Sequence, residues 1–154
     1  MNLLAHLLVS LVLFACAGTT QQPSAIKQGI LGKITLREGN FMPSPDRKNS
    51  PANAAPEKTA TREIYVYELT NVNQAKAEGG FYTQIKTKLV TKVVTEPDGM
   101  FQVALKPGKY SVFSKEPGGL FANLLDGDNN IYPVTVTENR LTLVDFVIDY
   151  NASY

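Results

Sequence analysis

The sequence has no tryptophan, one histidine (His6) and one cysteine (Cys16). A disulfide within the chain is therefore impossible. His6 lies in an N-terminal apolar segment, and if that segment is removed after Ala15 the remaining chain has no histidine. Ser–His and Cys–His nucleophile pairs and histidine-bound zinc are then excluded, because each needs an imidazole. Without tryptophan, a sugar-stacking face would depend on tyrosine and phenylalanine, which on strands are more often core residues.

The chain also lacks any dense block of one charge. Its 154 residues include 15 Lys+Arg and 14 Asp+Glu, so the formal net charge is +1. No basic run is long enough to form a phosphate-binding stripe, and nucleic acid is not an expected partner. The length suits a single domain with one hydrophobic core.

An apolar run over residues 3–14 is too short to span a bilayer, which takes about 20 residues, but it suits the core of a signal peptide. It ends in Leu13-Phe14-Ala15-Cys16, which resembles the bacterial lipobox. That resemblance implies cleavage after residue 15, a diacylglycerol on the Cys16 thiol and an acylated new N-terminus. Lipidation would also remove the only thiol available to zinc. Residues 16–28 are then the lipidated cysteine and a flexible tether. The alternative is a plain signal peptide with an unmodified cysteine.

From residue 29 onward the pattern indicates strands. Ile30, Gly32 and Ile34 alternate with Leu31 and Lys33, as in a strand with one buried face. Similar strands are expected at 62–69, 89–94, 101–105, 110–113, 131–137 and 141–150. In the last of these, one face carries the apolar side chains of Val144, Phe146, Ile148 and Tyr150.

Turns at Pro97-Asp98-Gly99 and Pro107-Gly108 predict a three-stranded meander over residues 88–114. A short helix over residues 72–78 is weakly indicated. The prediction for residues 29–154 is one all-β domain: a single antiparallel sandwich of about seven strands.

The two turn motifs, with Phe101 and Tyr110 after them, resemble the signature of carboxypeptidase regulatory-like domains, and Gly32-Lys33-Ile34 resembles their opening strand. The resemblance implies a transthyretin-like (prealbumin-like) sandwich and a non-enzymatic module. Two further phrases, Gly39-Asn40-Phe41-Met42-Pro43 and Phe146-Val147-Ile148-Asp149-Tyr150, resemble small lipoproteins of Bacteroidetes-type bacteria. The chain departs from the pattern in a proline-rich insertion over residues 41–61, which we interpret either as a mobile loop or as a partner-binding loop.

One candidate metal site is present in the sequence. Asp126, Asp128 and Asn130 place oxygen ligands at alternate positions and could converge on calcium. An EF-hand loop would need Gly and Glu where Ile131 and Thr137 stand, and the same residues suit a tight turn with no metal.

Just before it, Leu120, Phe121 and Asn123 lie in a glycine-rich segment that could form a binding loop. The competing interpretation is that Leu120, Phe121, Leu124 and Leu125 fill the core at the end of the sandwich.

The leading hypothesis is a non-enzymatic lipoprotein of the cell envelope. It would be held in the outer membrane by Cys16, with the periplasmic face favoured, and act as a binding or assembly accessory for an envelope protein or glycan. The alternative is a calcium- or glycan-dependent surface binder that uses residues 116–130. A carboxylate-pair hydrolase is a third hypothesis, although Asp145 and Asp149, four residues apart on one strand, are too distant to act as a close pair.

Overall fold

The computed structural model describes residues 26–41 and 58–154. The strands in this part are β1 (Gly29–Asn40), β2 (Glu63–Glu68), β3 (Lys76–Glu78), β4 (Phe81–Thr83), β5 (Leu89–Val94), β6 (Met100–Ala104), β7 (Gly108–Glu116), β8 (Gly119–Phe121), β9 (Pro133–Val136) and β10 (Leu141–Ser153). The predicted all-β sandwich is confirmed, with ten strands in the described residues where about seven were expected.

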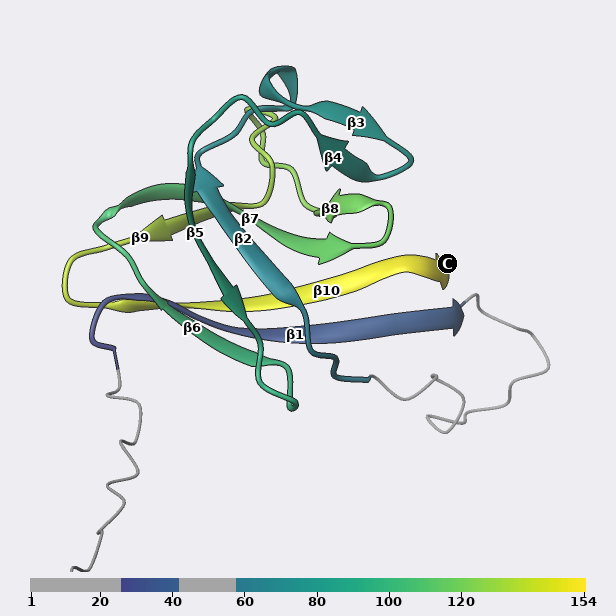
Figure 1. Cartoon of the computed structure of the whole chain (residues 1–154), viewed down its shortest axis with the longest axis horizontal. Coiled ribbons are helices and arrows are strands. Elements are labelled where there is room, and N and C mark those ends of the chain that lie inside the picture. Colours follow the sequence, from purple (N-terminus) through teal and green to yellow (C-terminus); the bar gives the residue numbers. More distant parts are fainter. Residues whose placement is uncertain (1–25, 42–57) are drawn as a thin grey trace, which may run out of the picture.

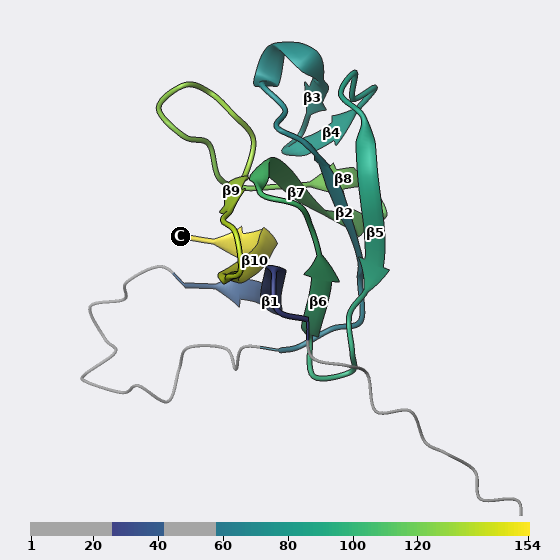
Figure 2. The same ribbon diagram turned by 90° about the vertical axis from the view of Figure 1, so that its left-hand side faces the viewer.

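The strands form two layers (Figures 1 and 2). The smaller sheet has the order β10-β1-β6, and the larger has the order β3-β4-β8-β7-β2-β5, with β9 also paired to β7. Strands β8 and β9 pair with successive parts of β7, at Ser114–Glu116 and Gly108–Ser111 respectively. The core between the sheets includes fully buried side chains from both layers, among them Ile30, Ile34, Val66, Val112 and Phe146.

One pairing departs from the antiparallel prediction. Strand β1 runs parallel to β10, from Gly29 beside Leu141 to Asn40 beside Ser153, whereas the other strand pairs are antiparallel. The sequence alternation correctly assigned inward faces to both strands, because alternation follows from strand geometry alone. It carries no information on which strand lies alongside which.

The predicted meander over residues 88–114 is wrong in its pairing. Strand β5 pairs with β2, while β6 crosses to the smaller sheet and pairs with β1. The hydroxyl of Thr95 accepts a hydrogen bond from Arg62 N (2.9 Å) and donates one to Ala60 O (3.1 Å), which holds the chain where it leaves the larger sheet. Turn residues mark where a chain reverses, but they do not show which sheet it enters next.

Where β6 pairs with β1, two residues of the smaller sheet are in close contact. Gly32 on β1 lies opposite Phe101 on β6 in the strand register. A Cβ atom at residue 32 would overlap the Phe101 ring. Phe101 is 3% exposed, and burying a phenylalanine contributes about 1.5–3 kcal/mol. The absence of a side chain at Gly32 therefore allows Phe101 to pack across β1.

The weakly indicated helix over residues 72–78 is also absent. Residues Val72–Gln74 form a single 3-10 turn, η2, and Lys76–Glu78 form strand β3. The chain is already extended at Ala75 (φ −141°), and β3 pairs with β4 across a turn at Gly79 and Gly80. Both glycines have positive φ, the conformation that glycine adopts at least cost.

Within the described ranges, no helix has both the length and the apolar character needed to cross a membrane.

Candidate functional site

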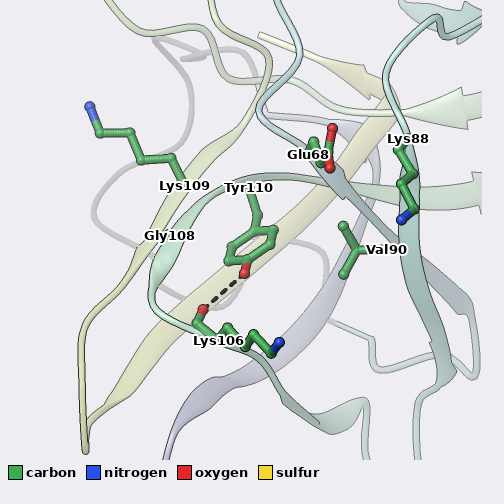
Figure 3. Close-up of a pocket in the computed structure, with 7 residues that line it drawn as sticks. All are labelled: Glu68, Lys88, Val90, Lys106, Gly108, Lys109 and Tyr110. Carbon is green, nitrogen blue, oxygen red and sulfur yellow. Dashed lines mark hydrogen bonds between the residues drawn. The ribbon is translucent and has the colours of Figure 1, made fainter.

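A hollow of about 540 Å³ opens at one end of the sandwich, between the end of β2, the start of β5 and the β6–β7 turn (Figure 3). Its lining residues are Glu68, Lys88, Val90, Lys106, Gly108, Lys109 and Tyr110. The ammonium groups of Lys88, just before β5, and Lys106, in the β6–β7 turn, are turned toward the hollow, whereas that of Lys109 points away. The hollow thus presents two cations, with one carboxylate at its margin.

Tyr110 positions the β6–β7 turn that carries Lys106. Its ring is buried, and its hydroxyl donates a hydrogen bond to the Lys106 carbonyl oxygen over 2.9 Å. This contact bridges the turn and holds the backbone at residue 106 against a core residue. Lys106 is therefore presented from a braced turn, although its own side chain is exposed.

The chemistry of this hollow is that of electrostatic binding. Two lysine ammonium groups can hold an anion such as a phosphate or carboxylate, while Val90 and the Tyr110 ring supply apolar walls. Glu68 reduces the positive potential on one side. This site was not predicted from the sequence, because Lys88 and Lys106 are 18 positions apart and fall in turns that carry no motif.

The first described residues enter the sandwich beside this hollow. Gln28 Nε2 donates to Leu105 O (2.7 Å), and Gln28 Oε1 accepts from Asn139 N (2.9 Å). Gly29 N donates to Arg140 O (3.1 Å). We call the three segments that meet here, residues 26–29, 105–109 and 137–141, the tether end. In Figure 1 they gather at the left of the molecule.

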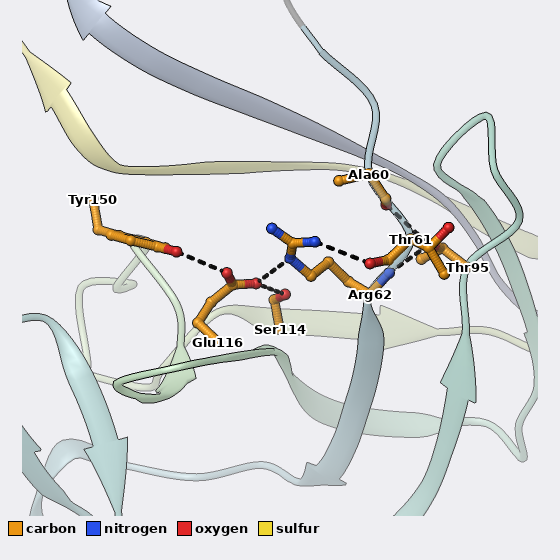
Figure 4. A network of polar contacts seen from close by, with 7 residues as sticks. All are labelled: Ala60, Thr61, Arg62, Thr95, Ser114, Glu116 and Tyr150. Carbon is orange, nitrogen blue, oxygen red and sulfur yellow. Dashed lines mark hydrogen bonds and ion pairs between the residues drawn. The ribbon is translucent and has the colours of Figure 1, made fainter.

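A second polar cluster lies between the sheets (Figure 4). The Glu116 side chain is 0% exposed, and its Oε1 accepts from Arg62 Nε (2.9 Å) and Ser114 Oγ (2.7 Å). Its Oε2 accepts from the Tyr150 hydroxyl (2.9 Å). Burial and, secondarily, the hydrogen bond to Glu116 raise the pKa of Tyr150. The cluster links β7 in the larger sheet to β10 in the smaller one.

This cluster is satisfied by its own members. Both Glu116 oxygens are engaged, and Arg62 Nη1 also donates to Thr61 O (3.0 Å). A buried carboxylate with three donors, one of them cationic, is a stable cross-link between sheets. We assign Glu116 a structural role. In the sequence, the one sign of this role is that Glu116 is an acidic residue at an inward position of β7. The sequence does not indicate which residues Glu116 contacts.

The structure brings Asp126 and Asn130 together, and Asp128 takes part through its backbone. Asp126 Oδ1 accepts from Asp128 N (3.0 Å) and Asn130 N (2.8 Å), and Oδ2 accepts from Asn130 Nδ2 (2.9 Å). These hydrogen bonds, with a smaller effect from the positive charge of Lys109, lower the pKa of Asp126. The Asp126 carboxylate, which a calcium ion would need as a ligand, is thus already hydrogen-bonded within its own loop.

Within residues 26–41 and 58–154, no three side chains of His, Cys, Asp and Glu are grouped closely enough to hold a metal ion.

The predicted binding residues Leu120, Phe121 and Asn123 do not form one surface. Leu120 and Phe121 belong to β8, where Leu120 is half-buried and Phe121 is in the core against Phe146. Asn123 is exposed and donates through Nδ2 to Asp149 Oδ1 (2.9 Å).

Leu124 and Leu125 are exposed, so the expectation that they fill the core is wrong. Their backbone closes the loop: Leu124 O accepts from Tyr132 N (2.8 Å), and Leu125 bridges to Ile131. The predicted lipidation site, Cys16, and residues 42–57 of the proline-rich loop lie outside the described residues.

Comparisons with known proteins add no relative: no family model, no curated protein and no solved structure matches this chain.

Proposed function

We propose that this protein is a non-enzymatic, lipid-anchored binding or assembly module of the bacterial cell envelope. Cys16 would carry the lipid, and the sandwich would be held at the periplasmic face of the outer membrane. The observation that carries the proposal is the Leu13-Phe14-Ala15-Cys16 sequence after a short apolar run. Two or three acyl chains, at about 0.8 kcal/mol per buried methylene, are enough for stable anchoring.

The geometry of the tether end supports the anchored arrangement. About a dozen residues separate Cys16 from Gln28, so the anchor can lie at most about 40 Å from the domain. The Gln28 side chain is hydrogen-bonded to both neighbouring turns, so the described chain enters the sandwich at this end. The lysine-lined hollow opens at that same end and is the site at which we expect binding.

A binding role is also favoured by the side chains that the processed chain would contain and by those that line the hollow. Cleavage before Cys16 would leave a chain without histidine, and acylation would consume its thiol. The hollow offers ammonium groups, a carboxylate and apolar walls, which suit recognition of an anionic group.

The anchor is tested by radiolabelled palmitate in cells that express the full-length chain. We expect label on the wild type and none on Cys16→Ser, with the variant moving from the membrane to the soluble fraction. A matched control, Cys16→Ser/Ser24→Cys, restores a thiol eight positions downstream without the motif, and it should stay unlabelled. Equal labelling of wild type and Cys16→Ser would refute the anchor.

The binding role is tested by photo-crosslinking in living cells, with a photoreactive amino acid at Lys88 or at Lys106. We expect one defined envelope component to be captured from both positions. The control carries the photoreactive amino acid at Lys76 on β3, away from the hollow. Identical products from the control position would show that capture reflects proximity in the envelope and not the hollow.

A further inference from the structure

The tether end carries a concentration of positive charge. Its segments expose Lys27, Lys106, Lys109 and Arg140, and Glu138 is the acidic residue among them. These cations come from three parts of the chain that the β1–β6 and β1–β10 pairings bring together. Outside these segments, Lys88 adds a fifth cation across the hollow, where Glu68 opposes it, and Asp126 lies within electrostatic reach of Lys109. The net formal charge of the residues at this end is therefore positive.

Exposed leucines lie beside these charges. Leu141 and Leu143 begin β10, next to Arg140, and their side chains are 38% and 76% exposed. The inward positions of this part of β10 are held by Val144 and Phe146, so Leu143 projects from the outer face, where it pairs in register with Leu31 of β1. Leu143 is the most exposed large apolar side chain in the described residues.

We propose that the tether end seats directly on an anionic phospholipid surface. Lys106, Lys109 and Arg140 would contact headgroup phosphates, and Leu141 and Leu143 would enter the interface. This inference rests on the proposed anchor at Cys16, which keeps this end of the domain near the bilayer. Clustered lysine and arginine residues are attracted to anionic lipid within a Debye length, and adjacent apolar side chains add burial in the interface.

Such seating would orient the sandwich. Lys109 and Lys115 are near opposite ends of β7, a strand about 25 Å long. With the tether end on the membrane, β8 and the β7–β8 turn would be raised away from the headgroups. A domain that hangs freely on its tether would have no such preference.

The orientation can be measured by energy transfer to headgroup-labelled lipid. The full-length acylated protein is reconstituted into vesicles of phosphatidylglycerol and phosphatidylethanolamine, with a single dye on Thr137→Cys or on Lys115→Cys. The Cys16 thiol is blocked by its lipid and does not react. We expect stronger transfer from position 137 than from position 115 at about 50 mM salt, and similar transfer from both at about 500 mM salt. Vesicles of phosphatidylcholine should also give similar transfer.

Charge variants test the surface itself. Lys106→Glu/Lys109→Glu/Arg140→Glu should abolish the excess transfer at position 137. The matched triple variant Lys76→Glu/Lys86→Glu/Lys115→Glu, with the same change in net charge near β3, β4 and the β7–β8 turn, should preserve it. If the first variant does not fold, the neutralising variant Lys106→Gln/Lys109→Gln serves in its place and should reduce the excess.

The leucines are tested in the same vesicles. Leu143→Asp should lower the transfer from position 137, whereas Val94→Asp, at an exposed residue of β5, should not.

Equal transfer from the two dye positions at low salt would overturn the proposal. The proposal would also be overturned if inorganic phosphate, added at constant ionic strength, removed the difference in transfer between positions 137 and 115. The lysines would then be a site for free phosphate. Palmitate incorporation is measured on the same preparations. A protein that carries lipid but shows no orientation refutes only this inference, whereas a protein without lipid refutes the proposed anchor.

Discussion

Replacing Arg62 by methionine would remove the guanidinium that faces the buried Glu116 carboxylate (Figure 4). One charge-assisted hydrogen bond contributes about 1.5–3 kcal/mol, and breaking a buried ion pair costs about 3–5 kcal/mol. Arg62 is 28% exposed and the hydrogen bonds from Ser114 and Tyr150 remain, so water and these donors offset part of the loss. We expect Arg62→Met to lower the free energy of unfolding by about 3 kcal/mol.

The double variant Arg62→Met/Glu116→Leu separates the value of the pair from the cost of an orphaned charge. Because both charges are removed, we expect it to lose clearly less stability than Arg62→Met alone. The lone variant leaves a carboxylate in the interior, while the double variant leaves only the hydroxyl groups of Ser114 and Tyr150 to find new partners.

The assay is urea unfolding of the purified full-length protein, with the free energy taken by linear extrapolation. Lys58→Met is the matched control, because the Lys58–Glu38 ion pair (3.4 Å) joins side chains that are 62% and 42% exposed. Such a surface pair contributes about 0–1 kcal/mol. Two results would contradict a buried, mutually dependent ion pair: Arg62→Met costs no more stability than Lys58→Met, or the double variant is the least stable of the set.

Two further predictions concern the core. Gly32→Val should lower the free energy of unfolding by about 1–3 kcal/mol, measured as a drop in Tm, because the new side chain must displace the Phe101 ring. Tyr132 has a pKa raised to about 12, mainly by burial and secondarily by Asp145. Tyrosines of the unfolded chain ionise near pH 10, so the stability that neutral Tyr132 contributes should be complete below pH 10 and lost as the pH rises to about 12. The urea midpoint, followed from pH 9 upward, measures this loss.

Each of these predictions has its own control. Gly127→Val places the same side chain where no atom lies within 4 Å, and it should leave Tm nearly unchanged. An equal loss at both glycines would mean that backbone freedom, and not the Phe101 contact, sets the cost. Tyr132→Phe should flatten the alkaline decline, although it also removes the hydrogen bond to Asp145 O (2.9 Å). An unchanged decline would show that other groups cause it, and Tyr154→Phe, at an exposed residue, gives the baseline.

Most inward-facing core residues could be predicted from local pattern. Alternation placed Ile30, Ile34, Phe146 and Ile148 correctly, because successive side chains of a strand point to opposite faces whatever the strand pairs with. Prediction failed for Leu124 and the residue after it. An apolar residue in a loop has no such period, and here the loop backbone, closed by hydrogen bonds to residues 131–132, leaves the side chains outside.

The candidate site was the less predictable part. The sequence singled out Asp126, Asp128 and Asn130 because they are adjacent and rich in oxygen, and the structure shows the Asp126 carboxylate closing its own loop. The hollow between Lys88 and Lys106 was not predicted, since neither residue lies in a motif.

By itself, the sequence determined the all-β class, most of the strands and their buried faces, and the exclusion of a disulfide within the chain. These follow from local geometry and from which residue types are present. Only the tertiary structure decided that β1 and β10 pair in parallel, that β6 joins their sheet, and that Glu116 meets Arg62 and Tyr150. Pairings between strands far apart in the chain depend on how whole faces pack together. The cations of the tether end come from three separate segments, and these segments meet only after that packing is complete.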